Sequence, residues 1–332
     1  MSTSIYTSQY KDQHAISIES DSTVAQFLPT IGAKMCSLVY KPLGLELMIQ
    51  RPGKEYLLQP YDGSFVAGEC SGLDDMFPTI DECFYEAPPW KGTRIPDHGE
   101  VWSIPWDHNI EHGRLHMATY GVRFPYRMEK WVSFADPTVL RIDYTVTNLS
   151  AFDFEFLWAA HPMFYLEEGA EISLPRGVEK VQAAFTVNGC MGRYADEFDW
   201  PVCRLPGGIQ RDLRQIRPEQ TREADKYFIK GKMPEGWCAV RYPQSNLTLA
   251  LSFPVEQVPY LGILTNEGGW DNLYNLFLEP CTMPFDRPDI GRKLGEVSTV
   301  GAKSTVSWYL NISIGEGTSF TGVDTEGKLL LP

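Results

Sequence analysis

His161 and Glu279 are the ionisable residues whose type and setting best suit acid/base chemistry. Each stands directly before a proline, as His161-Pro162 and Glu279-Pro280, at the end of an apolar run. The position before proline favours an extended backbone, and proline lacks the N–H that would continue a sheet ladder. We therefore expect both side chains at strand ends, where the rim of a sheet can hold a general acid or base rigidly. Either residue alone in such a place is more often a solvated or hydrogen-bonded bystander.

Alternating patterns predict the strands that carry these two residues. Apolar and polar residues alternate from 139 to 161, interrupted by a turn at 148–151. The second half of this pattern places His161 on the more polar face of a strand that the following proline ends. Residues 272–279 form another alternating apolar run, and we expect that strand to end at Glu279.

The rest of the chain is typical of an all-β protein. Aromatic residues make up 13% of the sequence, with 28 glycines and 24 prolines, which indicates many short elements and frequent turns. Residues 31–47 predict a hairpin around a turn at 41–44, residues 63–106 long loops between brief strands, and residues 305–314 a last long strand. We find no linker, and large all-β folds often reach this length as one unit, so we predict a single domain spanning 1–332.

The charge of the chain narrows the classes of partner. A formal net charge of −14 would repel both the phosphates of nucleic acid and an anionic membrane surface, so we expect a neutral small-molecule partner. No apolar run is long enough to cross a bilayer, and the polar N-terminus does not resemble a secretory signal, so we expect a cytoplasmic protein. The cysteines are scattered without a CxxC pair, which predicts neither a disulfide framework nor a thiolate metal site.

Four short segments, taken together, resemble the aldose 1-epimerase (galactose mutarotase) family. FLWAAHPMFYL surrounds His161, and NLFLEPCTMP surrounds Glu279. IPDHGEVWSIPW is similar to the family's His-Gly motif and contains His98, while ADKYFIKGK resembles the segment that offers an aspartate to sugar hydroxyls, here Asp225. The four residues follow the family's order, and the resemblance runs loosely over residues 32–307.

The resemblance implies a fold, a reaction and a role for each residue. The fold would be a large twisted antiparallel β-sandwich, the galactose mutarotase-like supersandwich, with the site in a central concave cleft. The reaction would be the interconversion of the α and β anomers of a hexose, with Glu279 as the base, His161 as the acid, and His98 and Asp225 contacting the sugar. This chemistry needs neither a metal nor another cofactor. We expect a monomer or a weak homodimer.

The chain departs from the family where a sugar-binding arginine is expected before the first histidine. The corresponding stretch, CSGLDDMFPTIDECFY, contains Asp74 and Asp75 but no arginine. Arg94 is a candidate substitute, although its spacing differs. Asp75 is a candidate for binding hydroxyls, and the alternative is that both aspartates form a solvated loop pair. The departure bears on substrate identity more than on reaction type.

Two tryptophans are candidates for contact with a sugar ring. Trp102 lies close to His98, and Trp270 lies shortly before Glu279. An indole ring can stack on the apolar face of a pyranose and has few rotatable bonds to order. Packing in the core is the alternative for each of them.

A zinc site is the rival hypothesis from another enzyme class. His108 to His112 matches the H-x-x-E-H pattern of zinc peptidases, and His116 follows. That pattern needs a helix, whereas Gly113 and the flanking residues indicate strands. We therefore predict no metal site there.

Two further alternatives keep the fold and change the function. The chain could be a non-catalytic carbohydrate-binding protein, since a fold does not dictate activity; the acid/base pair favours an enzyme. It could also act on a hexose 6-phosphate, which would require clustered cations such as Lys91, Arg94 and Arg123 near the cleft. The net acidity of the chain argues against a phosphorylated substrate.

Overall fold

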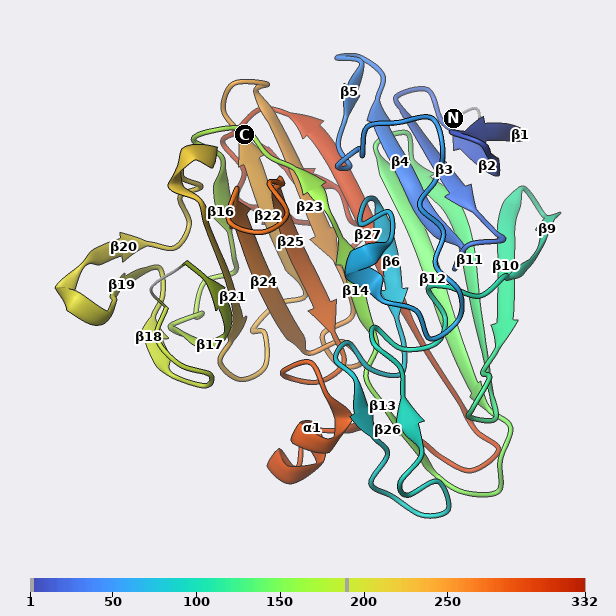
Figure 1. Ribbon diagram of the computed structural model, residues 1–332. Helices are drawn as coiled ribbons and strands as arrows, with labels where there is room; N and C mark the ends of the chain where they lie inside the picture. The colour runs from blue at the N-terminus through green and yellow to red at the C-terminus, as the bar shows by residue number, and fades with distance from the viewer. Residues whose placement is uncertain (1–2, 189–190, 332) are drawn as a thin grey trace.

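The computed structural model describes residues 3–188 and 191–331, and two large antiparallel sheets dominate it (Figure 1). The predicted all-β fold is confirmed. The sheets lie face to face as a twisted sandwich, and the larger sheet faces the viewer over much of Figure 1.

The larger sheet has 13 strands and holds the residues at the centre of the functional hypothesis. Across the sheet, its main path consists of β1 (Ser4–Tyr10), β2 (Gln13–Glu19), β3 (Thr23–Leu28), β4 (Lys34–Tyr40), β6 (Leu73–Met76), β14 (Ala159–Pro162), β25 (Tyr274–Cys281), β24 (Tyr260–Glu267), β21 (Glu223–Ile229), β17 (Lys180–Val187) and β18 (Glu197–Asp199). Off this path, β5 (Leu45–Glu46) pairs with β4, and β15 (Phe164–Tyr165) pairs with β25.

The second sheet has 8 strands and backs the first. In order, it consists of β16 (Glu171–Ser173), β22 (Trp237–Tyr242), β23 (Leu247–Ser252), β27 (Thr305–Glu316), β12 (Val139–Asn148), β11 (Tyr126–Asp136), β10 (Arg114–Tyr120) and β9 (Asp107–Glu111).

Four short ribbons and a few short helices lie outside the two large sheets. Four two-stranded ribbons pair β7 (Cys83–Phe84) with β8 (Arg94–Ile95), β13 (Phe154–Phe156) with β26 (Ser298–Val300), β19 (Val202–Arg204) with β20 (Gln210–Asp212), and β28 (Gly322–Val323) with β29 (Leu329–Leu330). The helices are α1 (Pro288–Leu294) and the 3-10 turns η1 (Phe65–Ala67), η2 (Pro206–Gly208) and η3 (Glu219–Thr221). Of the helices described, none is long and apolar enough to cross a membrane.

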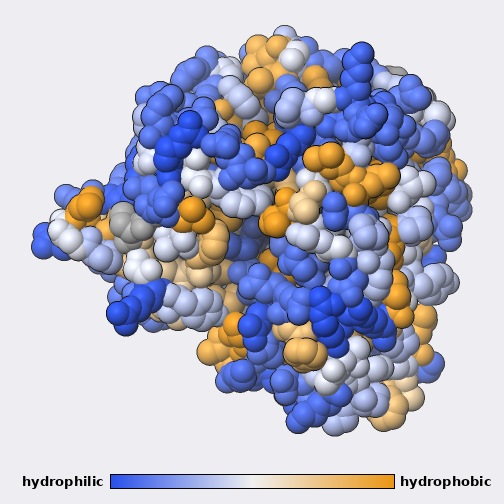
Figure 2. Space-filling view, in the orientation of Figure 1, coloured by the Kyte–Doolittle hydropathy of each residue, from blue (hydrophilic) through white to orange (hydrophobic). Residues whose placement is uncertain are grey.

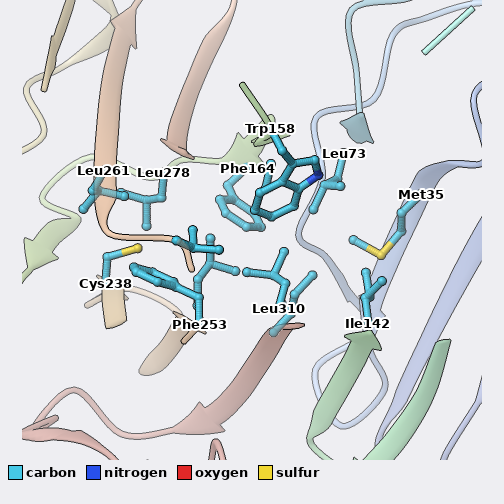
Figure 3. Close-up of a cluster of buried hydrophobic side chains, with 14 of the residues drawn as sticks. Met35, Leu73, Ile142, Trp158, Phe164, Cys238, Phe253, Leu261, Leu278 and Leu310 are labelled. Carbon is cyan, nitrogen blue, oxygen red and sulfur yellow. The ribbon is translucent and has the colours of Figure 1, made fainter. Parts of the chain in front are cut away.

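The main hydrophobic core fills the space between the two sheets (Figure 3). Leu261 and Leu278 point into this core from the larger sheet, and Leu310 and Ile142 point into it from the smaller one, all with essentially no exposure. Because side chains alternate along a strand, the neighbours of these leucines point to the opposite face of the larger sheet. The core therefore determines which residues of β24 and β25 are available to a cleft.

Several strand predictions are confirmed. The hairpin at 31–47 forms as β4 and β5, the last long strand forms as β27, and residues 63–106 contain only brief strands between loops. Residues 107–111 form the strand β9, so His108 and His112 do not share one face of a helix as the zinc-peptidase pattern requires.

Two strand boundaries differ from the prediction. The pattern from 152 to 161 is broken, because β13 pairs with β26 and the chain then enters the larger sheet as β14. The strand β25 continues past Glu279 through Pro280 to Cys281. Proline costs little there, because the ladder between β25 and β14 is confined to the pair Ala159 and Cys281. Glu279 is therefore an internal strand residue rather than a terminal one.

Candidate active site

His161 and Glu279 belong to one row of residues that crosses the larger sheet. Asp74 on β6 pairs with His161 on β14, and Glu279 on β25 pairs with Gly262 on β24. Ala159 pairs with Cys281, so two residues further along these antiparallel strands His161 comes opposite Glu279. The register of the sheet, rather than a loop, thus brings the two residues together.

The two side chains meet where His161 lines a cleft and Glu279 lies buried behind the cleft lining. Nε2 of His161 lies 3.4 Å from Oε1 of Glu279. His161 is 5% exposed and Glu279 is 0% exposed. Nδ1 of His161 and Oε1 of Glu279 make no hydrogen bond. Unpaired buried polar atoms are costly, so their presence here points to a site that a ligand completes.

Lys226 is the second neighbour of Glu279. Its Nζ lies 2.8 Å from Oε2 of Glu279 and 2.8 Å from Oδ1 of Asp286, an ion pair with the first residue and a hydrogen-bonded ion pair with the second. Lys226 comes from β21, two strands away from β25, and its side chain is 7% exposed. Glu279 therefore lies between the imidazole of His161, which can gain or lose a proton, and the ammonium of Lys226.

The cleft above these residues has a volume of about 260 Å³. One water molecule needs only about 15 Å³ in such a measure, so the space suits a small ligand. The ionisable residues that line it are Asp81, His98, His161, Lys226 and Asp286. Its aromatic residues are Phe65, Phe185, Tyr194, Trp270 and Phe277. Figure 2 shows a hollow near the centre of this face of the molecule.

Burial shifts the pKa values of the central pair in opposite directions. Loss of solvent raises the pKa of the Glu279 carboxyl, and the nearby ammonium of Lys226 opposes this rise. Loss of solvent also lowers the pKa of His161 well below its ordinary value, and the charges of His98 and Lys226 lower it further. The site therefore disfavours the ionised form of either residue when it stands alone.

His98 reaches the cleft from a loop and approaches His161. The two rings lie edge to face with centroids 5.3 Å apart, and His98 stacks on Phe65 at 4.1 Å. Nδ1 of His98 lies 2.8 Å from Oδ1 of Asp97, which fixes the ring and leaves Nε2 for another partner. Gly99 has a φ of +79°, and a Cβ there would lie 2.2 Å from the carbonyl oxygen of Phe77. Only glycine fits this turn, so the loop holds His98 in one place.

Asp225 and Asp75, both predicted sugar ligands, point away from the cleft. Asp225 is fully buried and binds Arg211 at 2.5 Å. Asp75 is fully buried and binds Lys130 at 2.7 Å. Because side chains alternate along a strand, the cleft side of β21 carries the next residue, Lys226, in place of Asp225. The structure does not support a ligand-binding role for either aspartate.

Arg94 and Trp102 also lie outside the cleft lining. Arg94 is held 2.6 Å from Asp62 and pairs with Glu82, so its charge is already compensated. Trp102 donates from Nε1 to the carbonyl oxygen of Asp97 at 3.1 Å and packs edge-on against Phe65. It thus supports the His98 loop from behind. Trp270, the other tryptophan considered above, does line the cleft.

Three charged cleft residues were not predicted from the sequence: Asp81, Lys226 and Asp286. Lys226 directly follows Asp225, so a shift of one residue in the strand phase would have found it. Asp286 lies in the turn after β25, and Asp81 lies in a loop whose sequence shows no periodicity. Their proximity depends on long-range strand pairing, which short sequence patterns do not contain.

Comparison with known proteins supports the fold. No protein-family model matches the sequence, and no curated protein matches it significantly. The Slr1438 protein from Synechocystis sp. PCC 6803 is similar, with 16% identity and a TM-score of 0.68 over 94% of this chain and 99% of that chain. An aldose 1-epimerase candidate from Klebsiella pneumoniae has 14% identity and a TM-score of 0.71 over 96% of this chain and 85% of that chain.

A galactose mutarotase-like protein from Clostridium acetobutylicum gives the same result. It has 13% identity and a TM-score of 0.62 over 95% of this chain and 99% of that chain. At such low identity the likeness concerns the fold, and it confirms the predicted galactose mutarotase-like sandwich.

Proposed function

We propose that this protein is a mutarotase that interconverts the α and β anomers of an uncharged hexose. The observation that carries the proposal is the pair of buried acid/base groups, His161 and Glu279, whose atoms lie 3.4 Å apart, with His161 lining the cleft and Glu279 directly behind it. The similar folds of a mutarotase-like protein and an aldose 1-epimerase candidate support the reaction class.

The chemistry needs one proton to be given and one to be taken. Glu279 accepts the proton of the anomeric hydroxyl, the C1–O5 bond breaks as C1=O1 forms, and His161 protonates the ring oxygen. Rotation about C1–C2 and the reverse transfers then close the ring to the other anomer. Because burial raises the pKa of Glu279 and lowers that of His161, the pair favours a state with a single proton between them. The exchange requires this proton on His161, with Glu279 as the carboxylate. Burial works against that distribution, and the ammonium of Lys226 counteracts burial at Glu279.

The remaining cleft residues fit a sugar ring. Trp270, Phe65 and Phe185 offer apolar surfaces on which a pyranose can stack. His98, Asp81 and Asp286 offer hydrogen-bonding groups for its hydroxyls. Proton transfer alone achieves the reaction, so the proposal calls for neither a metal nor another cofactor.

The charges around the cleft favour an uncharged sugar over a sugar phosphate. Asp81 and Asp286 line the cleft, and Lys226 is already shared between two carboxylates. Of the cations considered for a phosphate, Arg94 and Arg123 both bind Asp62 and neither lines the cleft. A phosphate group there would meet uncompensated negative charge.

Polarimetry of fresh sugar solutions tests the proposal. We expect the protein to accelerate mutarotation of α-D-glucose or α-D-galactose, and to act at least ten-fold less efficiently on glucose 6-phosphate. Acceleration confined to the phosphate would contradict the assigned substrate class. Binding of a free hexose without any acceleration would instead identify a carbohydrate-binding protein.

A further inference from the structure

Lys226 is a buried cation that the acid/base exchange does not use directly. Its pKa is lowered by burial alone, but the carboxylates of Asp286 and Glu279 outweigh that effect and raise it. It therefore stays protonated. Within the described part of the chain, Lys226 is the only lysine or arginine that lines the cleft. A charge in this position acts on the proton balance of the catalytic pair.

The sheet is built so that Glu279 can reach this lysine. Gly262 is the residue opposite Glu279 on β24, between β25 and β21. A Cβ at Gly262 would lie 3.0 Å from Oε2 of Glu279 and 3.0 Å from the ring of Phe228 on β21. The carboxylate of Glu279 thus occupies the space next to Gly262 that a larger side chain at this position would fill. Oε2 meets Lys226 there, and Oε1 remains directed toward His161.

We propose that Lys226 is a positioning residue that holds the Glu279 carboxylate over Gly262 and keeps the shared proton off it. This inference rests on the proposed function, and it assigns to Lys226 a cationic role in a cleft whose lining, among the residues that the structure describes, contains no arginine. Oε1 is then left free to receive the proton of the substrate.

The other charged groups around Glu279 determine how the loss of Lys226 would change the pKa of Glu279. Asp286, from the turn after β25, raises the pKa of Glu279, and the charged form of His98 lowers it. His161 faces Oε1 from β14, and Asp81 lines the same cleft from its loop. Cys281, on β25 beyond Pro280, carries no charge because burial raises its thiol pKa well above the ordinary value. Without Lys226, the carboxylates of Glu279, Asp286 and Asp81 would share the cleft without a fixed cation.

Opposite substitutions give opposite expected shifts. Lys226→Met removes a positive charge in contact with Glu279, so both limbs of the pH profile of kcat should move up, by about one to three pH units. Asp286→Asn removes a negative charge and frees Lys226 for Glu279, so the profile should move down, by on the order of one unit. Lys226→Arg should restore most of the wild-type profile.

A structural role alone would not move the pH profile. Lys130→Met is the matched control, because Lys130 is also a buried lysine in an ion pair, with Asp75 on the other face of the sheet. It should lower stability and leave the profile in place. Profiles of Lys226→Met and Asp286→Asn that coincide with the wild type, or that shift in the same direction, would overturn the inference.

An infrared titration separates this inference from the proposed function. The carboxyl band of Glu279 is obtained as the difference between the wild type and Glu279→Gln across pH, with and without Lys226→Met. A rise in the Glu279 titration of about one unit or more on loss of Lys226 supports the inference even if no sugar is turned over. An unchanged titration would overturn it even in an active mutarotase.

Discussion

Nε2 of His161 lies 3.4 Å from Oε1 of Glu279, and neighbouring strands of one sheet hold both residues in place. Neither side chain has more than slight access to solvent. The protonation of each side chain therefore depends on its neighbour and on folding. This dependence can be measured as a change in the free energy of unfolding with pH.

His161 should make folding sensitive to acid. In the unfolded chain a histidine titrates near pH 6.5, while burial lowers the pKa of His161 in the folded protein. Between these two values the unfolded state binds one more proton, so stability falls as the pH falls, by about 1.4 kcal/mol per pH unit. The raised pKa of Glu279 acts in the opposite direction, so the contribution of His161 must be isolated as a difference.

Urea unfolding at about pH 7.5 and about pH 5.5 isolates the contribution of His161 to the pH dependence of stability. His161→Asn should lose less stability than the wild type over this interval. The exposed His108 on β9 provides the matched control, and His108→Asn should retain the wild-type dependence. Parallel curves for the wild type and His161→Asn would contradict the prediction.

The buried pair of Asp75 and Lys130 should be structural. Both side chains have 0% exposure, and Asp75 also accepts a hydrogen bond from Nε1 of Trp158 at 3.0 Å. Asp75→Asn leaves Lys130 without its charge partner and should lower the unfolding free energy by about 3 to 5 kcal/mol. Asp199→Asn, which breaks an exposed pair with Lys180, should cost at most about 1 kcal/mol. Loss of sugar binding by Asp75→Asn in a fully stable protein would instead revive a role in the cleft.

Gly262 should be required for activity rather than for folding. An added methyl group would press on Oε2 of Glu279 and on the ring of Phe228, each 3.0 Å away. A displacement of about 1 Å at a catalytic group can cost on the order of 100-fold in rate. We expect Gly262→Ala to lower kcat by at least 10-fold with a smaller change in KM. Gly301→Ala is the control, because a methyl group there meets nothing closer than 3.4 Å. Equal kcat values for the two variants would show that the carboxylate position is not critical.

The sequence predicted the strands better than the faces on which their residues lie. Alternation in 305–314 and in 139–147 identified β27 and β12, because each strand has one face in the core. On β21 nearly every residue is buried, so hydropathy cannot tell Asp225 from Lys226. Asp225, the residue that resembled a family motif, lies on the face of β21 opposite the cleft.

The sequence singled out His161 and Glu279, which the structure brings within 3.4 Å, but it did not predict their surroundings. The residues His161 and Glu279 each carried a local signal, a proline next in sequence within an apolar segment. Lys226 and Asp286 carry no such signal, and they reach Glu279 only because β21, β24 and β25 lie side by side in the sheet. Charge compensation across strands is a property of the register, which one sequence does not reveal.

Mutarotation kinetics of Glu279→Gln test the central claim most directly. Glu167→Gln is the matched control, because Glu167 is also a buried carboxylate but binds the backbone of Gln244 and Ser245 outside the cleft. We predict that the wild type and Glu167→Gln accelerate mutarotation of a free hexose, whereas Glu279→Gln still binds the sugar but loses at least 100-fold in kcat, the upper part of the contribution of a general base. A Glu279→Gln variant as active as the wild type would contradict the assignment of this cleft as the catalytic site.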